Sequence, residues 1–161
     1  MALTTEQLAT LKAAIAADPV LNALPNNTDS AFEIAYQMNQ PASPDFIVWK
    51  SNVSVDEIMR NGMAWDRVDN LSVGKARIWD WMTRLGTLDA SRANIRAGID
   101  AAWVGTAADL AVRATVYTHC KRKATRCEKL LASGTGSEAG PATMTFEGNL
   151  SYQDAFNARN S

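Results

Sequence analysis

The side chains that most often carry catalysis or bind metals are scarce in this sequence of 161 residues, which holds one histidine and two cysteines. His119 and Cys120 are adjacent, so on a helix their side chains point about 100° apart and do not converge as a nucleophile and its base must. Cys127 follows Cys120 by seven residues, and on one helix that spacing puts the thiols about 10 Å apart, too far for a disulfide. The spacing does not suit zinc either. We therefore expect no enzymatic activity, no metal and no cofactor.

The densest charge cluster is a basic run, which comprises Lys121, Arg122, Lys123, Arg126 and Lys129. On a helix, Arg122, Arg126 and Lys129 share one face, which would suit nucleic-acid phosphates or an acidic protein surface. Cations near a helix C-terminus are also favoured by the helix dipole without any partner. We expect Lys121, Arg122, Lys123 and Arg126 to contact DNA or an acidic surface. Sequence-specific DNA recognition is not expected, because the chain shows no helix-turn-helix pattern.

Composition and charge are those of one globular domain. The sequence is 47% apolar and 20% charged, which suits a soluble chain with a real core. No apolar run approaches the roughly 20 residues that a membrane helix needs, and we see no secretory signal. The net charge of −1 hides an asymmetry, because residues 1–71 carry −5 and residues 106–132 carry +4. Oppositely charged segments of this kind either pair head to tail between copies of the chain or are solvated without any partner.

The spacing of apolar residues and the capping signals predict a mainly α fold, a bundle of about six helices. Four residue pairs have the three-residue spacing of a capping box: Thr4 with Gln7, Ser30 with Glu33, Thr106 with Asp109, and Ser151 with Asp154, which would cap a final helical piece. The expected helical segments are 4–17, 30–39, 54–61, 72–85, 89–105 and 106–132. The last segment is either one long helix or two helices with a break near residues 121–123. Residues 46–53 suit either a strand or a buried connector, and residues 63–71 suggest no particular element.

Two tryptophans on one expected helix are candidate interface residues. Trp79 and Trp81 are two positions apart, so they cannot both face the same core. Tryptophan is enriched at interfaces, and we expect one of this pair to lie at an edge or an interface.

The C-terminal region differs in composition from the rest. Residues 133–141 are rich in Gly and Ser, which is typical of a linker, and residues 142–159 carry large side chains around a short strand or hairpin. These candidate partner-binding residues are Met144, Phe146, Leu150, Tyr152 and Phe156. They either pack back on the helical body or dock on a neighbour, and the linker before them favours docking. We therefore expect a helical body over residues 1–132 and an extended docking arm over residues 133–161.

Four segments resemble a family of small structural proteins of tailed bacteriophages. They are GKARIWDWM at 74–82, ATRCEKLLASGTG at 124–136, PATMTFEG at 141–148 and LSYQD at 150–154. The resemblance extends over nearly the whole chain, and the architecture is similar to that of head–tail adaptors of the phage neck.

The resemblance implies a virion component that is made in the host cytoplasm and carries no catalytic motif. It implies a homo-oligomeric ring of twelve copies, with the arm docked on the portal protein and the helical body facing the next neck or tail protein. The basic run would then face genomic DNA in the channel or an acidic neighbour. A tail-completion protein, a capsid-decorating protein and a small nucleic-acid-binding regulator are the alternatives.

Overall fold

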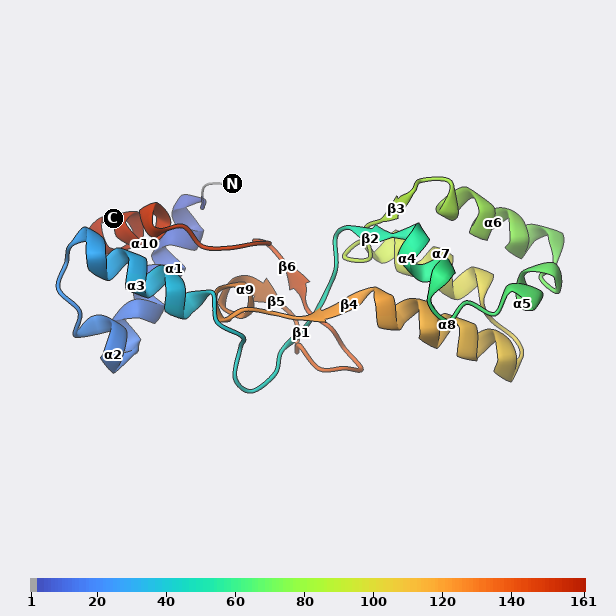
Figure 1. Cartoon of the computed structure of the whole chain (residues 1–161), viewed down its shortest axis with the longest axis horizontal. Coiled ribbons are helices and arrows are strands. Elements are labelled where there is room, and N and C mark those ends of the chain that lie inside the picture. The colour runs from blue at the N-terminus through green and yellow to red at the C-terminus, as the bar shows by residue number, and fades with distance from the viewer. Residues whose placement is uncertain (1–2) are drawn as a thin grey trace. The chain divides into compact units, whose positions relative to one another are not determined.

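The computed structural model describes residues 3–161 and confirms a mainly α fold with a few short strands (Figure 1). Within this range there are ten helices, and the expected number was about six. The difference arises because the expected segment 106–132 contains two helices and because three helices lie outside the six expected segments, at Pro19–Asn22, Trp65–Asp69 and Tyr152–Asn160. The first two of these have only four and five residues, which is too short to show a helical period in the sequence.

The helices vary from one turn to more than three. They are α1 (Thr5–Ala17), α2 (Pro19–Asn22), α3 (Thr28–Met38), α4 (Val55–Arg60), α5 (Trp65–Asp69), α6 (Val73–Thr83), α7 (Ala93–Ala102), α8 (Ala107–His119), α9 (Arg126–Leu131) and α10 (Tyr152–Asn160). The expected segment 106–132 is divided into α8 and α9, with the break at residues 121–123 that was one of the two alternatives.

The strands form three two-stranded sheets. The strands are β1 (Ile47–Trp49), β2 (Val53–Ser54), β3 (Thr87–Leu88), β4 (Lys121–Lys123), β5 (Ala132–Ser133) and β6 (Thr143–Met144). β1 pairs with β4. β2 and β3 are antiparallel, with Val53 opposite Leu88, and β5 and β6 are antiparallel, with Ala132 opposite Met144. Of the segments left open, 46–53 contains β1 and the first residue of β2, and 63–71 contains α5, whereas the helix expected at 54–61 is α4.

The chain forms two compact units whose boundaries differ from the expected division at residue 132. Of the described residues, unit 1 contains 3–48 and 123–161, and unit 2 contains 49–122. Residues 133–161 thus belong to the same unit as the N-terminal helices. The composition change at residue 133 suggested a boundary, but Gly and Ser also occur in the loops that connect paired strands, as here between β5 and β6.

Unit 1 is built from α1, α2, α3, α9 and α10. A capping box starts α1, in which the Thr4 hydroxyl accepts from the Gln7 backbone N–H and the Gln7 side chain accepts from the Thr4 N–H. The core contains Leu11 and Ile15 of α1 together with Ile34 of α3, and α10 packs against both helices. Residues from both ends of the chain therefore share one core.

Unit 2 is built from α4 to α8 and the β2–β3 sheet. Trp103 is fully buried at its centre, and its indole ring meets that of Trp79 edge-on, with 5.3 Å between ring centroids and an interplanar angle of 76°. Val53, Ile58 and Val116 complete the core around this pair. All five tryptophans of the chain lie within residues 49–122.

Candidate interaction surfaces

The large C-terminal side chains mostly face the interior of unit 1. Phe146 and Leu150 are 7% and 3% exposed and belong to the core that α1 and α3 form. Phe156 is half-buried against the same core, and Met144 packs against a small cluster around Val48. Of the two alternatives for this region, the structure shows the packed one. Docking on a partner stays a prediction for this segment, and Phe146 and Leu150 would have to leave the core to take part in it.

Hydrogen bonds hold the same segment in place. The Asn39 carboxamide donates to the Leu150 carbonyl at 3.0 Å and accepts from the Leu150 N–H at 2.7 Å. The buried Glu128 carboxylate accepts from the Gly148 N–H at 3.0 Å. The expected linker is an ordered loop between β5 and β6, in which the Gly136 carbonyl accepts from the N–H of Ile47 at 2.8 Å.

One of the expected partner-binding residues does lie at the surface. Tyr152 of α10 is 40% exposed and stacks on Phe32 of α3, with 4.2 Å between ring centroids. Phe32 is itself 54% exposed, and Tyr36 lies one turn further along α3 with 60% exposure. We call Phe32, Tyr36 and Tyr152 the aromatic surface of unit 1. The exposed carboxylates of Asp29 and Glu33 are on the same helix.

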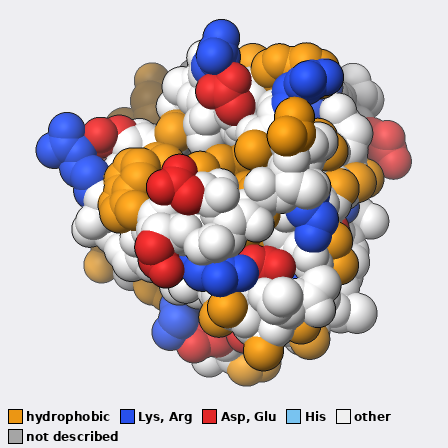
Figure 2. All heavy atoms as spheres, turned by 90° about the vertical axis from the view of Figure 1, so that its right-hand side faces the viewer, with side chains coloured by type: hydrophobic (Ala, Val, Ile, Leu, Met, Phe, Trp, Pro, Cys, Tyr) orange, Lys and Arg blue, Asp and Glu red, His pale blue; other side chains and the backbone are white. Residues whose placement is uncertain are grey.

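Unit 2 exposes apolar side chains along α6 and just after it. Val73, Trp81 and Leu85 are 76%, 62% and 62% exposed, whereas Trp79 is 2% exposed. The expectation that only one of the two tryptophans faces the core is confirmed, and Trp81 is the residue at the surface. We call Val73, Trp81 and Leu85 the apolar surface of unit 2. In Figure 2, hydrophobic side chains reach the surface of this end in several groups, between charged side chains of both signs.

The basic run does not form one helical face. Lys121 and Lys123 are in β4, whereas Arg126 and Lys129 are in α9. Lys123 pairs with Asp45 at 2.6 Å, and the Lys121 ammonium lies 5.8 Å from the centroid of the Trp49 ring. The idea of a shared face failed because it assumed that a helix continues through residues 121–123.

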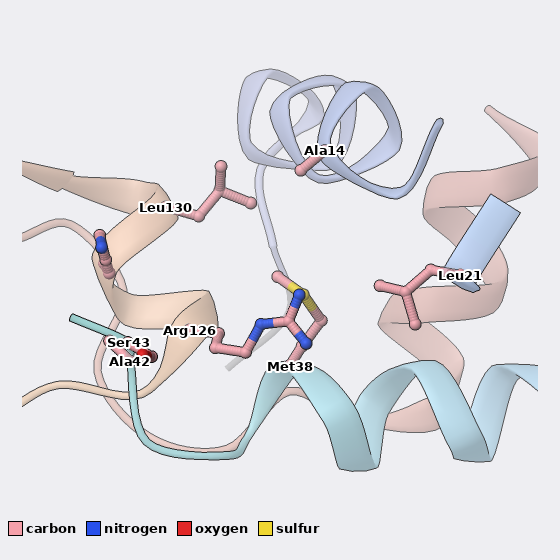
Figure 3. A pocket seen from close by; sticks show the side chains of 8 residues that line it. Ala14, Leu21, Met38, Ala42, Ser43, Arg126 and Leu130 are labelled. Atoms are coloured by element: carbon pink, nitrogen blue, oxygen red, sulfur yellow. The ribbon is translucent and has the colours of Figure 1, made fainter. Parts of the chain in front are cut away.

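Two members of the run line a pocket in unit 1. The Arg126 guanidinium points into a pocket of about 250 Å³ (Figure 3), and Lys129 is one turn further along α9. Arg126 donates to Asp18 at 2.8 Å. Asp18 also caps α2, and its pKa is lowered by its hydrogen bond from the Leu21 backbone and by Arg126.

The residues with potentially reactive side chains, which are the two cysteines and the histidine, have structural roles. Cys120 is in the core of unit 2 and Cys127 in that of unit 1, both as free thiols. Burial raises the pKa of Cys120 to about 11 and that of Cys127 to about 12, so both thiols are protonated and weakly nucleophilic near neutral pH. The His119 Nε2 lies 2.8 Å from the Asn61 carbonyl, to which it donates.

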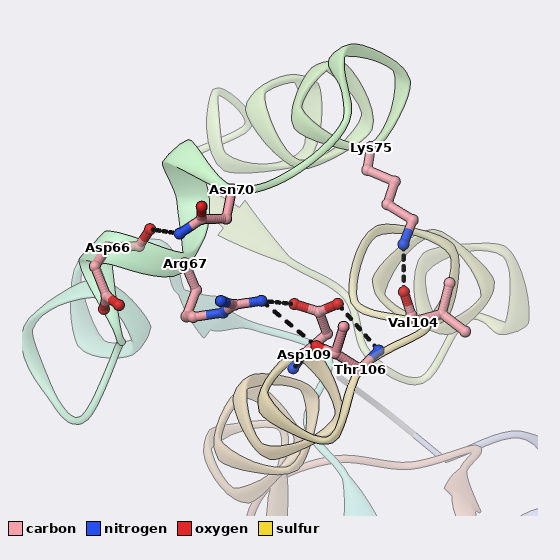
Figure 4. Close-up of polar contacts among 7 residues, drawn as sticks. All are labelled: Asp66, Arg67, Asn70, Lys75, Val104, Thr106 and Asp109. Atoms are coloured by element: carbon pink, nitrogen blue, oxygen red, sulfur yellow. Dashed lines mark hydrogen bonds and ion pairs between the residues drawn. The ribbon is translucent and has the colours of Figure 1, made fainter.

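An ion pair in unit 2, between half-buried Arg67 and buried Asp109, joins α5 to the start of α8 (Figure 4). The Arg67 guanidinium donates to the Asp109 carboxylate at 2.8 Å, and Asp109 forms the expected capping box with Thr106. Hydrogen bonds from Arg67 and Thr106 lower the pKa of Asp109 to about 2. Capping signals predicted the Thr106–Asp109 contact, but no local pattern could identify Arg67, which is 42 residues earlier in the chain. One Asp109 oxygen accepts from Arg67 and the other from the Thr106 N–H, so the cluster fixes the start of α8.

The part of the chain that the structure describes contains no group of three or more His, Cys, Asp or Glu side chains placed to hold a metal ion. No helix among residues 3–161 is both long and apolar enough to cross a membrane. The fold and its surfaces thus define a mainly α protein of two units, each with large apolar side chains at its surface. Comparison with protein-family models, with curated proteins and with solved structures finds no match to this chain.

Proposed function

We propose that this chain is a non-enzymatic structural protein of a tailed bacteriophage, a head–tail adaptor that assembles as a ring in the virion neck. The resemblance of residues 74–82, 124–136, 141–148 and 150–154 to small phage structural proteins supports the phage origin. The observation that carries the proposal is on α6, where Trp81 is 62% exposed within one of these segments. We assign the apolar surface of unit 2 to contacts with another virion protein.

Exposure of this kind favours a role in protein–protein contact. Isolated apolar residues at a surface are ordinary, but Trp81 and Leu85 are about one helical turn apart at the end of α6, and Val73 is exposed at its start. Tryptophan is among the residues that most often dominate binding energy, and truncating one at the centre of an interface typically costs about 2 kcal/mol or more. The charged side chains of both signs around this surface would orient a partner.

We infer that the helix surfaces make the contacts with the portal, and that a released C-terminal arm does not. Pulling the C-terminal segment out of unit 1 would expose Phe146 and Leu150, which are both in the core. Exposing one buried side chain of this size costs about 1.5–3 kcal/mol, so releasing both would cost about 3–6 kcal/mol before any new contact formed. Preformed surfaces on α6 and α3 need no such release.

The test is the molecular mass in solution of the chain alone and mixed with portal complexes purified from the same phage. We expect the wild-type chain to bind the portal, and we expect Trp81→Ala to weaken that binding at least about tenfold. Trp65→Ala is the matched control, because Trp65 of α5 is equally exposed at 60% and lies outside the segments that carry the resemblance. Both variants should keep the far-ultraviolet circular dichroism of the wild type.

A chain that stays monomeric and ignores portal complexes would refute the adaptor role. Binding to tails or to capsids in place of portals would assign the protein to tail completion or capsid decoration. Equal loss of binding in both tryptophan variants would show that the apolar surface of unit 2 is not the specific contact.

A further inference from the structure

The pocket in unit 1 combines an apolar floor with two cations. It lies between α1, α3 and α9, and α2 contributes one side chain. The lining residues are Ala14, Leu21, Met38, Ala42, Ser43, Arg126, Lys129 and Leu130. In Figure 3 the Arg126 guanidinium extends into the space between Met38, Leu21 and Leu130. A ligand that enters the pocket therefore meets a planar cation and hydrocarbon side chains within the same small volume.

The pocket carries more positive than negative charge. Arg126 and Lys129 are three residues apart on α9, so their side chains are on one face of the helix. One carboxylate, that of Asp18, balances Arg126 at 2.8 Å, and its other oxygen accepts from the Val20 and Leu21 backbone N–H groups. The Lys129 ammonium lies 5.7 Å from the centroid of the Phe46 ring. Among residues 3–161 it has no ion pair or hydrogen bond, which leaves one net positive charge for a ligand.

The size of the pocket limits what it can hold. Its volume is about 250 Å³, which is below the roughly 300–1,000 Å³ of sites for drug-sized ligands and cofactors. A single amino-acid residue fits, and a nucleotide does not. The group that the pocket encloses is therefore about the size of one residue, and the cations and the apolar floor favour a residue that carries both a negative charge and an apolar group.

Chain ends have this combination. An internal Asp or Glu residue has a carboxylate but no apolar group beyond it, whereas the last residue of a polypeptide can have an apolar side chain and an α-carboxylate on the same Cα. We propose that this pocket binds the C-terminal residue of a partner protein. Its α-carboxylate lies between Arg126 and Lys129, and its leucine-like side chain lies on Met38 and Leu21. Capture of a terminal carboxylate is a known mode of peptide recognition, and the inference is independent of the phage assignment.

The occupant is a partner and not Ser161. Ser161 accepts a hydrogen bond through its backbone carbonyl from the Lys12 ammonium of α1. Its hydroxymethyl side chain would also leave the apolar floor of the pocket uncovered.

The test uses the full chain and three acetylated tripeptides. The first, acetyl-Gly-Ala-Leu, has a free carboxylate. The second is the same peptide as a carboxamide, and the third, acetyl-Ala-Glu-Leu-carboxamide, has its only carboxylate on an internal residue. The probe is the methyl signal of Met38 in nuclear magnetic resonance spectra of protein labelled with ¹³C at the methionine methyl groups. We expect a saturable shift with the free acid and at least about tenfold weaker binding of the other two.

Three variants separate charge from shape. Lys129→Gln and Arg126→Gln should each weaken binding of the free acid about tenfold. Ala14→Leu should abolish binding, because it fills the pocket while both cations and a good helix former remain. Arg84→Gln is the matched control, since Arg84 has an exposed ion pair with Asp80 in unit 2, and it should bind as the wild type does.

Arg126→Gln also removes the ion pair with Asp18, so its fold is checked by circular dichroism. Lys129→Gln breaks no ion pair among the described residues and decides the result if the Arg126 variant unfolds. Equal binding of the acid and the carboxamide would overturn the inference, and so would full binding by Ala14→Leu. If the peptide with the internal glutamate bound as tightly as the free acid, the pocket would be assigned to internal acidic segments of a partner, and the inference of a terminal carboxylate would be wrong. Absence of any Met38 shift at about 10 mM peptide, the range of very weak binding, would also refute it.

Discussion

Removing the hydrogen bonds between Asn39 and Leu150 tests whether the C-terminal segment belongs to unit 1. Asn39 ends α3, and its carboxamide both donates to and accepts from the backbone of Leu150, 111 residues later. Asn39→Ala removes both hydrogen bonds without changing the core side chains. It therefore separates the attachment of this segment from the packing of Phe146 and Leu150.

The expected effect follows from the two bonds and their burial. A typical hydrogen bond contributes about 0.5–1.5 kcal/mol net, and a buried polar group left without a partner costs about 1–3 kcal/mol. Leu150 is 3% exposed, so water replaces the lost carboxamide poorly. Together these values predict a loss of about 2–3 kcal/mol in the free energy that holds the segment in place.

The measurement is amide hydrogen exchange followed by mass spectrometry. A loss of 2–3 kcal/mol predicts that the amides of residues 143–160 exchange about 30–150-fold faster. Tryptophan fluorescence in the native state should be unchanged, because every tryptophan lies in unit 2. Asn26→Ala is the control, since it removes one exposed hydrogen bond, to Asn160, and should change exchange by no more than a few fold. Unchanged exchange of residues 143–160 in Asn39→Ala would refute the reasoning.

Three further outcomes are expected. The folded pKa of Asp109 is about 2, below the ordinary 3.8. Its carboxylate therefore adds stability that is complete above about pH 4 and is lost as the pH falls towards 2. The urea midpoint of Asp109→Asn should change less between pH 4 and pH 2 than the urea midpoint of the wild type. Gly136→Ala should destabilise the chain by more than about 1–2 kcal/mol in urea, since φ is +65° and a Cβ would lie 2.1 Å from Phe46, and equal midpoints would contradict this. Cys120 and Cys127 should resist iodoacetamide at neutral pH until urea unfolds the protein, and rapid native labelling would disprove their burial.

Local signals in the sequence predicted the helix starts well. Thr4 with Gln7, Thr106 with Asp109 and Ser151 with Asp154 are at the spacing of a capping box, and all three boxes are present. These contacts span three residues, so they form wherever a helix forms and need nothing from the rest of the chain.

Predictions that depended on where a helix begins, or on a helix continuing without a break, were less successful. The second helix was expected from Ser30, but it begins at Thr28, because the Asn27 side chain caps it by accepting from the Ser30 N–H. The shared face of the basic run required a helix through residues 121–123, where the chain forms β4. An element boundary depends on which of several nearby caps is used, and packing decides that choice.

The sequence alone determined the mainly α character, the capping boxes and the fact that Trp79 and Trp81 face different environments, because each depends on neighbours within one or two turns. Only the tertiary structure decided that Trp79 is buried against Trp103, that Arg67 pairs with Asp109, and that the C-terminal side chains face inward. Those outcomes depend on residues far apart in the sequence. A hydrophobic side chain is driven out of water towards whichever apolar surface is available, and the fold determines which surface that is.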